Sequence, residues 1–273
     1  MQRREFLATT TAVSLAGVAG CSGFGGSGSG GSGGTPDYQT NGDYPADQNP
    51  DDGRPPKGMG GTPTKRSVDE SRFESLDVEG QTVTLVPLDV AHYWYARREA
   101  RFADARGQTQ FEASHVYGAV NSPAGEQSGS DPVLDWPKGD RVICYCGCPH
   151  HLSSLRAAAL QERGYENVYV IDEGFWAWHR QGYPMRGTHL DRTPAGYQIE
   201  GQVPSKYAGE YAWAEEPETD QQEAAPIRSD GSYHLHLKFS GLTPATPIVL
   251  RTPAYTLRAP LREFTAGVVS GGD

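Results

Sequence analysis

The sequence predicts an α/β protein with a parallel sheet flanked by helices, a disordered N-terminal tether and a small β-rich C-terminal domain. Short apolar runs alternate with helical stretches between residues 67 and 190. Glycine and serine dominate the segment before them, and strict strand-like alternation follows them. We therefore divide the chain into an export signal (1–21), a tether rich in Gly, Ser and Asp (22–66), an α/β domain (67–190) and a sandwich-like β domain (196–268).

Charge and cysteine content narrow the classes of function. The chain has 24 basic and 34 acidic residues, a net charge of -10. This balance favours solubility and argues against a nucleic-acid partner. Of the 4 cysteines, one is at position 21 and the others are at 144, 146 and 148. Such spacing does not suit a disulfide framework, so we expect cysteine chemistry instead.

The first 21 residues have the layout of an export signal. The letters RREFL (3–7) precede a weakly apolar run and small residues before Cys21. The run is shorter than the ~20 residues that span a bilayer. It resembles a twin-arginine signal followed by a lipobox. That resemblance implies export of a folded protein, lipidation of Cys21 and anchoring to the outer face of the cell membrane. A buried N-terminal helix is the alternative, but the glycine tract that follows disfavours it.

The tether is nearly pure glycine and serine up to residue 34 and rich in Pro, Gly and Asp up to about residue 64. It has too little apolar surface to offset the entropy lost on ordering, so we expect a flexible segment. Its aspartates should keep it extended. A lipidated cysteine followed by an acidic tether resembles exported lipoproteins of halophilic archaea.

The α/β domain is predicted from alternating periodicities. Strands are expected at 81–86, 102–107, 115–123, 141–146 and 167–171. Helices are expected at 88–103, 152–163 and 175–181. Elements at this spacing indicate a parallel sheet covered on both faces. Sites in such sheets lie at the carboxyl ends of central strands.

The segment VICYCGCPHHLSSLRAAAL (142–160) carries the chemistry. It predicts a strand, a tight loop beginning at Cys146, and a helix whose N-terminus points at that loop. Unpaired N–H groups and the helix dipole should stabilise a Cys146 thiolate. Ser153 or Ser154 is a candidate helix cap, and Cys144 is expected to be a small buried side chain.

Four motifs in order resemble the rhodanese (sulfurtransferase) domain. They are ADAR (103–106), HVYGAVNSP (115–123), YC (145–146) and VIDEGFWAW (170–178) followed by GYP (182–184). The resemblance covers roughly residues 76–187. Ser114 and Glu173 stand where the family pattern has glycine.

The resemblance implies a sulfurtransferase without a cofactor. Cys146 would take sulfane sulfur from a thiosulfate-type donor as a persulfide and pass it to a thiol or cyanide acceptor. Phosphatases of similar fold use Cys-x5-Arg, which would require arginine where this chain has Leu152. His151 replaces the basic residue often found at the end of the loop, so anion binding should be weaker or pH-dependent unless Arg156 or another cation reaches in. The expected substrate-binding loop comprises Gly147, Cys148, Pro149, His150, His151 and Leu152.

Other roles for the loop stay open. Cys148 is a candidate resolving thiol in a redox switch. Cys146 and Cys148 with His150 and His151 could also bind Cu(I) or Zn(II), although one tight loop rarely supplies a whole ligand set, and we assign no metal site. The alternative function is a non-catalytic thiol- or metal-binding or redox-switch module tethered to the membrane. Asp104 and Arg106 are expected to form a structural charge pair.

The C-terminal domain is predicted from strand alternation. The letters YHLHLKF (233–239) place apolar and polar residues on opposite faces, and 247–250 predicts another strand. His234 and His236 share the polar face, where solvent exposure is favoured over metal binding. Residues 210–225 are acidic and interrupted by proline, so we expect them outside the core.

Overall fold

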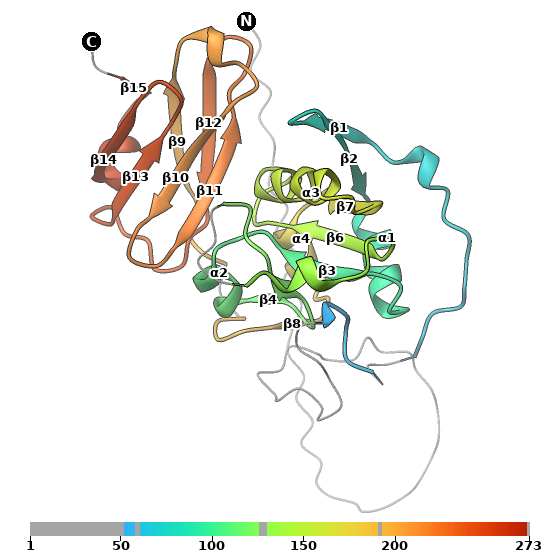
Figure 1. Cartoon of the computed structure of the whole chain (residues 1–273). Helices are drawn as coiled ribbons and strands as arrows, with labels where there is room; N and C mark the ends of the chain where they lie inside the picture. Colours follow the sequence, from blue (N-terminus) through green and yellow to red (C-terminus); the bar gives the residue numbers. More distant parts are fainter. Residues whose placement is uncertain (1–51, 58–60, 126–129, 191–192, 272–273) are drawn as a thin grey trace, which may run out of the picture. The chain divides into compact units, whose positions relative to one another are not determined.

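A computed structural model describes residues 52–57, 61–125, 130–190 and 193–271 (Figure 1). The export signal, Cys21 and the tether up to residue 51 lie outside the described residues. Within the described ranges, no helix is both long and apolar enough to cross a membrane.

The central sheet has six strands in the order β1-β2-β7-β6-β3-β5. The pairing of β1 with β2 is antiparallel and the others are parallel, which confirms the predicted α/β class. The catalytic-candidate strand β6 lies between β7 and β3. The strands are β1 (Ser75–Val78), β2 (Gln81–Val86), β3 (Arg101–Asp104), β5 (Val120–Asn121), β6 (Arg141–Tyr145) and β7 (Asn167–Ile171).

Helices cover both faces of this sheet (Figure 1). Side chains alternate along β6, so that Ile143 and Tyr145 join the core with α1 and α4, whereas Val142 and Cys144 join the core with α3. A strand buried on both faces needs apolar residues on both, and β6 has them from Val142 to Tyr145. The helices are α1 (Leu88–Ala96), α2 (Gln108–Ala113), α3 (Leu152–Glu162) and α4 (Phe175–Arg180).

Two element predictions in this domain are wrong. The helix expected at 88–103 ends at Ala96, because Arg98 adopts φ 56° and the chain then enters β3. The single strand expected at 115–123 is split into β4 (His115–Val116) and β5 by a turn at Gly118, where φ is 91°. Strand β4 pairs with β8 (Met185–Arg186) outside the main sheet.

Part of the predicted tether packs on the α/β domain. The Phe102 N–H donates to the Gly53 carbonyl at 2.7 Å. The Asp52 carboxylate forms an ion pair with Arg101 at 2.5 Å and with Arg54 at 3.1 Å. Residues 52–57 therefore differ from the expected disordered segment, since they satisfy a backbone donor of β3 and place a carboxylate beside two guanidinium groups.

Seven strands form the C-terminal β domain. Strands β11-β10-β13-β14 make one sheet and β12-β9-β15 the other. Tyr233 and Leu235 of β12 share a core with Ala212 of β10 and Leu250 of β13, so the two sheets pack as a sandwich. The strands are β9 (Tyr197–Gln202), β10 (Tyr211–Glu216), β11 (Gln221–Pro226), β12 (Ser232–Leu237), β13 (Pro247–Arg251), β14 (Thr256–Pro260) and β15 (Val269–Ser270). A four-residue helix, α5 (Leu261–Phe264), follows β14.

Residues 210–225 form two strands whose inward side chains belong to the core, contrary to the prediction. Along β10, Ala212 and Ala214 point inward, and Ala224 of β11 is fully buried. The Glu216 carboxylate is buried too, and it accepts the Glu218 N–H at 3.1 Å. The inward side chains are small alanines, which give a weak hydrophobic signal among acidic neighbours.

Candidate active site

Cys146 follows β6 directly, at the carboxyl end of that strand. The loop 146–151 leads from it into α3, which begins at Leu152 as predicted. The Cys146 thiol is fully buried; it donates to the Cys148 carbonyl at 2.9 Å and lies 3.3 Å from the Ser153 hydroxyl. A donor molecule can therefore reach this sulfur only when the loop, or the segment over it, moves.

The surroundings of Cys146 favour a protonated thiol. Burial, together with the Glu223 carboxylate, raises the pKa of Cys146 to about 12, against an opposing effect of the hydroxyl and N–H of Ser153. The expected stabilised thiolate is thus wrong for this arrangement. The helix terminus does face the sulfur, but removal of water and a nearby negative charge outweigh it.

The N-terminus of helix α4 contacts the backbone of the active-site loop. The Phe175 N–H donates to the Cys146 carbonyl at 2.9 Å. Gly174 precedes it with φ 71° and ψ 178°, and a Cβ added there would lie 3.1 Å from the Cys148 carbonyl. Glu173, a departure from the family pattern, accepts the Leu88 N–H at 2.9 Å and so satisfies the start of α1.

The two loop histidines have different partners. His150 adopts φ 63°, and its Nε2 lies 2.6 Å from Asp172 Oδ1. His151 is the N-cap residue of α3, with no side-chain cap hydrogen bond. Neither serine caps this helix, contrary to the prediction: the Ser153 hydroxyl contacts the Cys146 sulfur, and the Ser154 hydroxyl is buried without a hydrogen-bond partner.

Three side chains with metal-ligating atoms meet beside the loop. A ligand atom from each of Cys148, His151 and Glu223 lies within 4.8 Å of the other two. The Cys148 thiol also donates to the His236 carbonyl at 3.3 Å. Glu223 comes from β11 in the C-terminal domain, in a segment that the sequence placed outside the core. No sequence signal linked it to a loop 75 residues earlier, because only tertiary packing joins them.

The Asp104–Arg106 charge pair is present. Arg106 donates from Nε to Asp104 Oδ1 at 2.9 Å and from a terminal nitrogen to Oδ2 at 2.6 Å, and it also donates to the Ser114 carbonyl at 2.6 Å. Both side chains are buried. Arg156 does not reach the loop's anion-binding position; it bonds to the Ser122 hydroxyl at 2.8 Å and to Asp131. The loop therefore gains no cation from Arg156.

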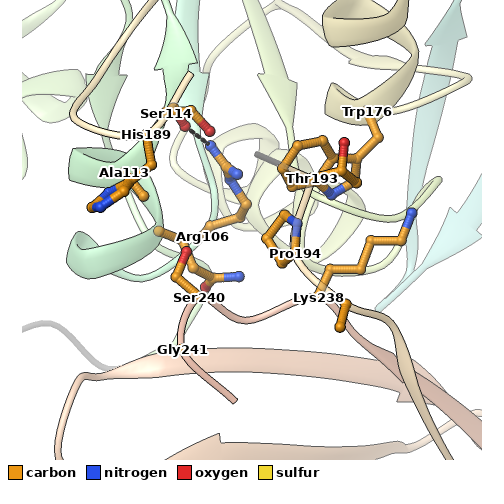
Figure 2. A pocket seen from close by; sticks show the side chains of 12 residues that line it. Arg106, Ala113, Ser114, Trp176, His189, Thr193, Pro194, Lys238, Ser240 and Gly241 are labelled. Carbon is orange, nitrogen blue, oxygen red and sulfur yellow. Dashed lines mark hydrogen bonds between the residues drawn. The ribbon is translucent and has the colours of Figure 1, made fainter. Parts of the chain in front are cut away.

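A cavity of about 690 Å³ lies between the α/β domain and the segment after β12, and Arg106, Trp176 and Lys238 are among the residues that line it (Figure 2). Figure 2 shows Arg106 on one side of it and Trp176 and Lys238 on the other. Trp176 connects the cavity to the loop, because a Cβ on Gly147 would lie 3.3 Å from its indole nitrogen. That nitrogen is buried without a hydrogen-bond partner in the described structure. The cavity thus offers basic side chains, and the Trp176 indole on its wall approaches the loop at Gly147.

Comparisons with known proteins bear on the α/β domain. A family model for the rhodanese-like domain matches residues 91–181. A thiosulfate sulfurtransferase, GlpE, of Actinobacillus succinogenes is 35% identical over 83 residues, which are 30% of this chain and 71% of that protein. The chain belongs to the rhodanese-like family. The GlpE protein of Vibrio cholerae is 27% identical over 104 residues, which are 38% of this chain and 94% of that protein.

Solved structures similar to this chain include other rhodanese-like proteins. A rhodanese-like domain from Anabaena sp. is 21% identical, with a TM-score of 0.35, and the match covers 41% of this chain and 84% of that one. A rhodanese with anions from E. coli is 26% identical, with a TM-score of 0.28 and coverage of 33% and 99%. The family match ends at residue 181, so the β domain that supplies Glu223 and Lys238 lies beyond the rhodanese-like region.

Proposed function

We propose that this protein is a sulfurtransferase that carries sulfane sulfur as a persulfide on Cys146. One observation carries the proposal: a thiol at the carboxyl end of the central strand of a rhodanese-like sheet, in a six-residue loop followed by Leu152. Leucine at this position leaves out the arginine that a Cys-x5-Arg phosphate site requires. The relatives named as thiosulfate sulfurtransferases support a thiosulfate-type donor.

The proposed reaction has two displacements. The Cys146 thiol first loses its proton to a base in solvent, and the thiolate then attacks the sulfane sulfur of thiosulfate. A new S–S bond forms, the bond to the sulfonate sulfur breaks, and sulfite leaves with the electron pair. An acceptor thiolate or cyanide next attacks the outer sulfur of the persulfide, and the Cys146 thiolate is released. Each step is a transfer of one sulfur atom, with no external oxidant.

The cavity beside the loop suits an anionic donor. Arg106 is already paired with Asp104, whereas Lys238 forms no ion pair with any described residue and lies 5.8 Å from the Trp176 ring. The Lys238 ammonium can therefore attract a dianion into the cavity.

The proposal includes a location outside the cytoplasm. The arginine pair at 3–4 and the lipobox-like residues before Cys21 support export and attachment to the membrane through a lipidated Cys21. In such a setting the donor is a small sulfur anion and the acceptor a thiol that reaches the outer face of the membrane.

Sulfur transfer from thiosulfate to cyanide tests the proposal directly. We expect activity in the reduced wild-type protein and a loss of at least about 1,000-fold in Cys146→Ala, because the nucleophile is gone. Cys144→Ala is the matched control, since it removes an equally buried thiol two residues earlier, inside β6 and not in the loop. Activity that survives in Cys146→Ala, or is absent from a folded wild type, contradicts the proposal.

The role of Cys148 needs a separate measurement. In Cys148→Ser we expect thiosulfate still to add one sulfur atom to Cys146, detectable as an increase in the intact mass. A resolving thiol would act after that step. If the variant takes up no sulfur although it is folded, Cys148 is a partner in persulfide formation itself.

A further inference from the structure

The group formed by Cys148, His151 and Glu223 makes and breaks no bond in the proposed sulfur transfer, yet its ligand atoms lie within 4.8 Å of one another. Two of the three residues come from the active-site loop, and the third comes from β11 of the sandwich. They combine a thiol, an imidazole nitrogen and a carboxylate. Mg²⁺ and Ca²⁺ favour oxygen ligands alone and Cu(I) favours soft ones, so this mixed set suits Zn²⁺ best.

The polar atoms of these three side chains have few hydrogen-bond or ion-pair partners among the described residues. His151 Nδ1 is buried and has no hydrogen-bond partner in the described structure. The Glu223 side chain is 3% exposed, and its carboxylate accepts the neighbouring Ala224 N–H at 3.0 Å. Its one ion-pair contact with a described residue is to that same His151 nitrogen, at 3.5 Å. A buried carboxylate facing an imidazole and a thiol lacks a cation of fixed charge, which a divalent ion would supply.

The spacing is close to that of a tetrahedral site. Two ligands bound at about 2.0–2.1 Å with tetrahedral angles lie about 3.3 Å apart. The observed distance of 3.5 Å between His151 Nδ1 and Glu223 Oε1 is close to this value. The sulfur lies within 4.8 Å of both atoms and needs to approach each by at most about 1.3 Å to complete three corners.

The other loop residues considered for a metal are engaged elsewhere. His150 Nε2 lies 2.6 Å from Asp172, and the Cys146 thiol donates to a carbonyl inside the loop. We propose that Cys148, His151 and Glu223 bind Zn²⁺, with a fourth position left for water. A bound ion would join the active-site loop to β11 and hold the loop over Cys146. The proposal concerns zinc binding and not catalysis, so its test does not depend on whether the protein transfers sulfur.

Calorimetry on the full-length, reduced, metal-free chain tests the carboxylate ligand. We expect wild type to bind about one Zn²⁺ per chain, and Glu223→Gln to bind it at least about tenfold more weakly. Glu216→Gln is the matched control, because Glu216 is an equally buried glutamate of the same sheet that bonds to Glu218 and Thr219. It should bind like wild type. Equal binding by wild type and Glu223→Gln, or no binding by folded wild type, overturns the proposal.

Cobalt identifies the sulfur ligand and does not depend on how well the Glu223 variant folds. With Co²⁺ as the probe, we expect a sulfur-to-cobalt charge-transfer band in wild type and in Cys146→Ser, and its loss in Cys148→Ser. A band that disappears in Cys146→Ser and persists in Cys148→Ser would assign the metal to the other thiol. That result, or no band in wild type, refutes the site as proposed.

Discussion

Burial shifts the pKa values of several side chains in the α/β domain far from those usual for their residue types. Cys144 and Cys146 lie two residues apart, and burial raises the pKa of each to about 12. Only Cys146 lies at the end of the strand, where the loop can open. His115 shows the same principle with the opposite charge: burial lowers its pKa to about 4, because the imidazolium loses its hydration. Its ring stacks on Phe111 with centroids 3.8 Å apart.

His115 makes stability depend on pH. Its folded pKa of about 4 lies below the ordinary histidine pKa of 6.5, so the unfolded chain binds more protons between these values. The free energy of unfolding must therefore fall as pH decreases through this window, by about 2 kcal/mol between pH 7 and pH 5 from this residue alone. Urea titrations at the two pH values should show this loss, and His115→Gln should reduce it. An equal loss in both proteins would contradict the assignment.

At the scale of elements, the N-terminus of α4 determines where the active-site loop lies. Gly174 combines φ 71° with ψ 178°, a conformation that only glycine adopts readily, and its Cα approaches the backbone of Cys148. The next residue, Phe175, donates its N–H to the Cys146 carbonyl. The glycine thus permits both the turn and the close contact that fix the nucleophile's backbone.

Replacing Gly174 should damage the loop more than the fold. We expect Gly174→Ala to cost about 1–3 kcal/mol of stability and to reduce sulfur transfer at least about tenfold, because the methyl group crowds the Cys148 carbonyl. Gly182→Ala is the control: it also has positive φ, 65°, but no atom lies within 4 Å of the added carbon. Gly182→Ala should lose stability but keep its sulfur-transfer activity. Thermal melts and thiosulfate assays on both variants separate the two effects, and equal activities would refute this role for Gly174.

At the scale of the whole molecule, the β domain contributes to the rhodanese-like site. Strand β11 brings Glu223 to the loop, and the segment after β12 brings Lys238 to the cavity. The Gln222 N–H also donates to the Gln110 side chain of α2, at 3.4 Å. The loop chemistry is therefore governed partly by residues outside the family match, one acidic and one basic.

The proposed membrane attachment belongs to this scale as well. We expect the mature protein to begin at a lipid-modified Cys21 and to partition with membranes, and Cys21→Ala to release it into the soluble fraction. Mass measurement of the mature N-terminus checks the expectation. A chain that still begins at unprocessed Met1 would contradict the anchor.

The sequence by itself determined the local features of this protein. The predicted bounds of β2 and β7 match the structure, Cys146 follows the central strand, and Asp104 pairs with Arg106. Periodicity and motif spacing act over short distances along the chain, so they can be read from residue order. The helix expected up to residue 103 failed because a single positive φ at Arg98 ends α1 earlier.

The tertiary structure alone decided the chemical environment of the site. The burial that keeps Cys146 protonated, the contact of Ser153 with its sulfur, and the meeting of Cys148 and His151 with Glu223 all depend on packing between distant segments. The inward residues of β10 and β11 are small alanines, so these strands show little hydrophobic alternation in the sequence. Solvent exclusion and electrostatic proximity are properties of the folded assembly, which is why residue order predicted the nucleophile but not its neighbours.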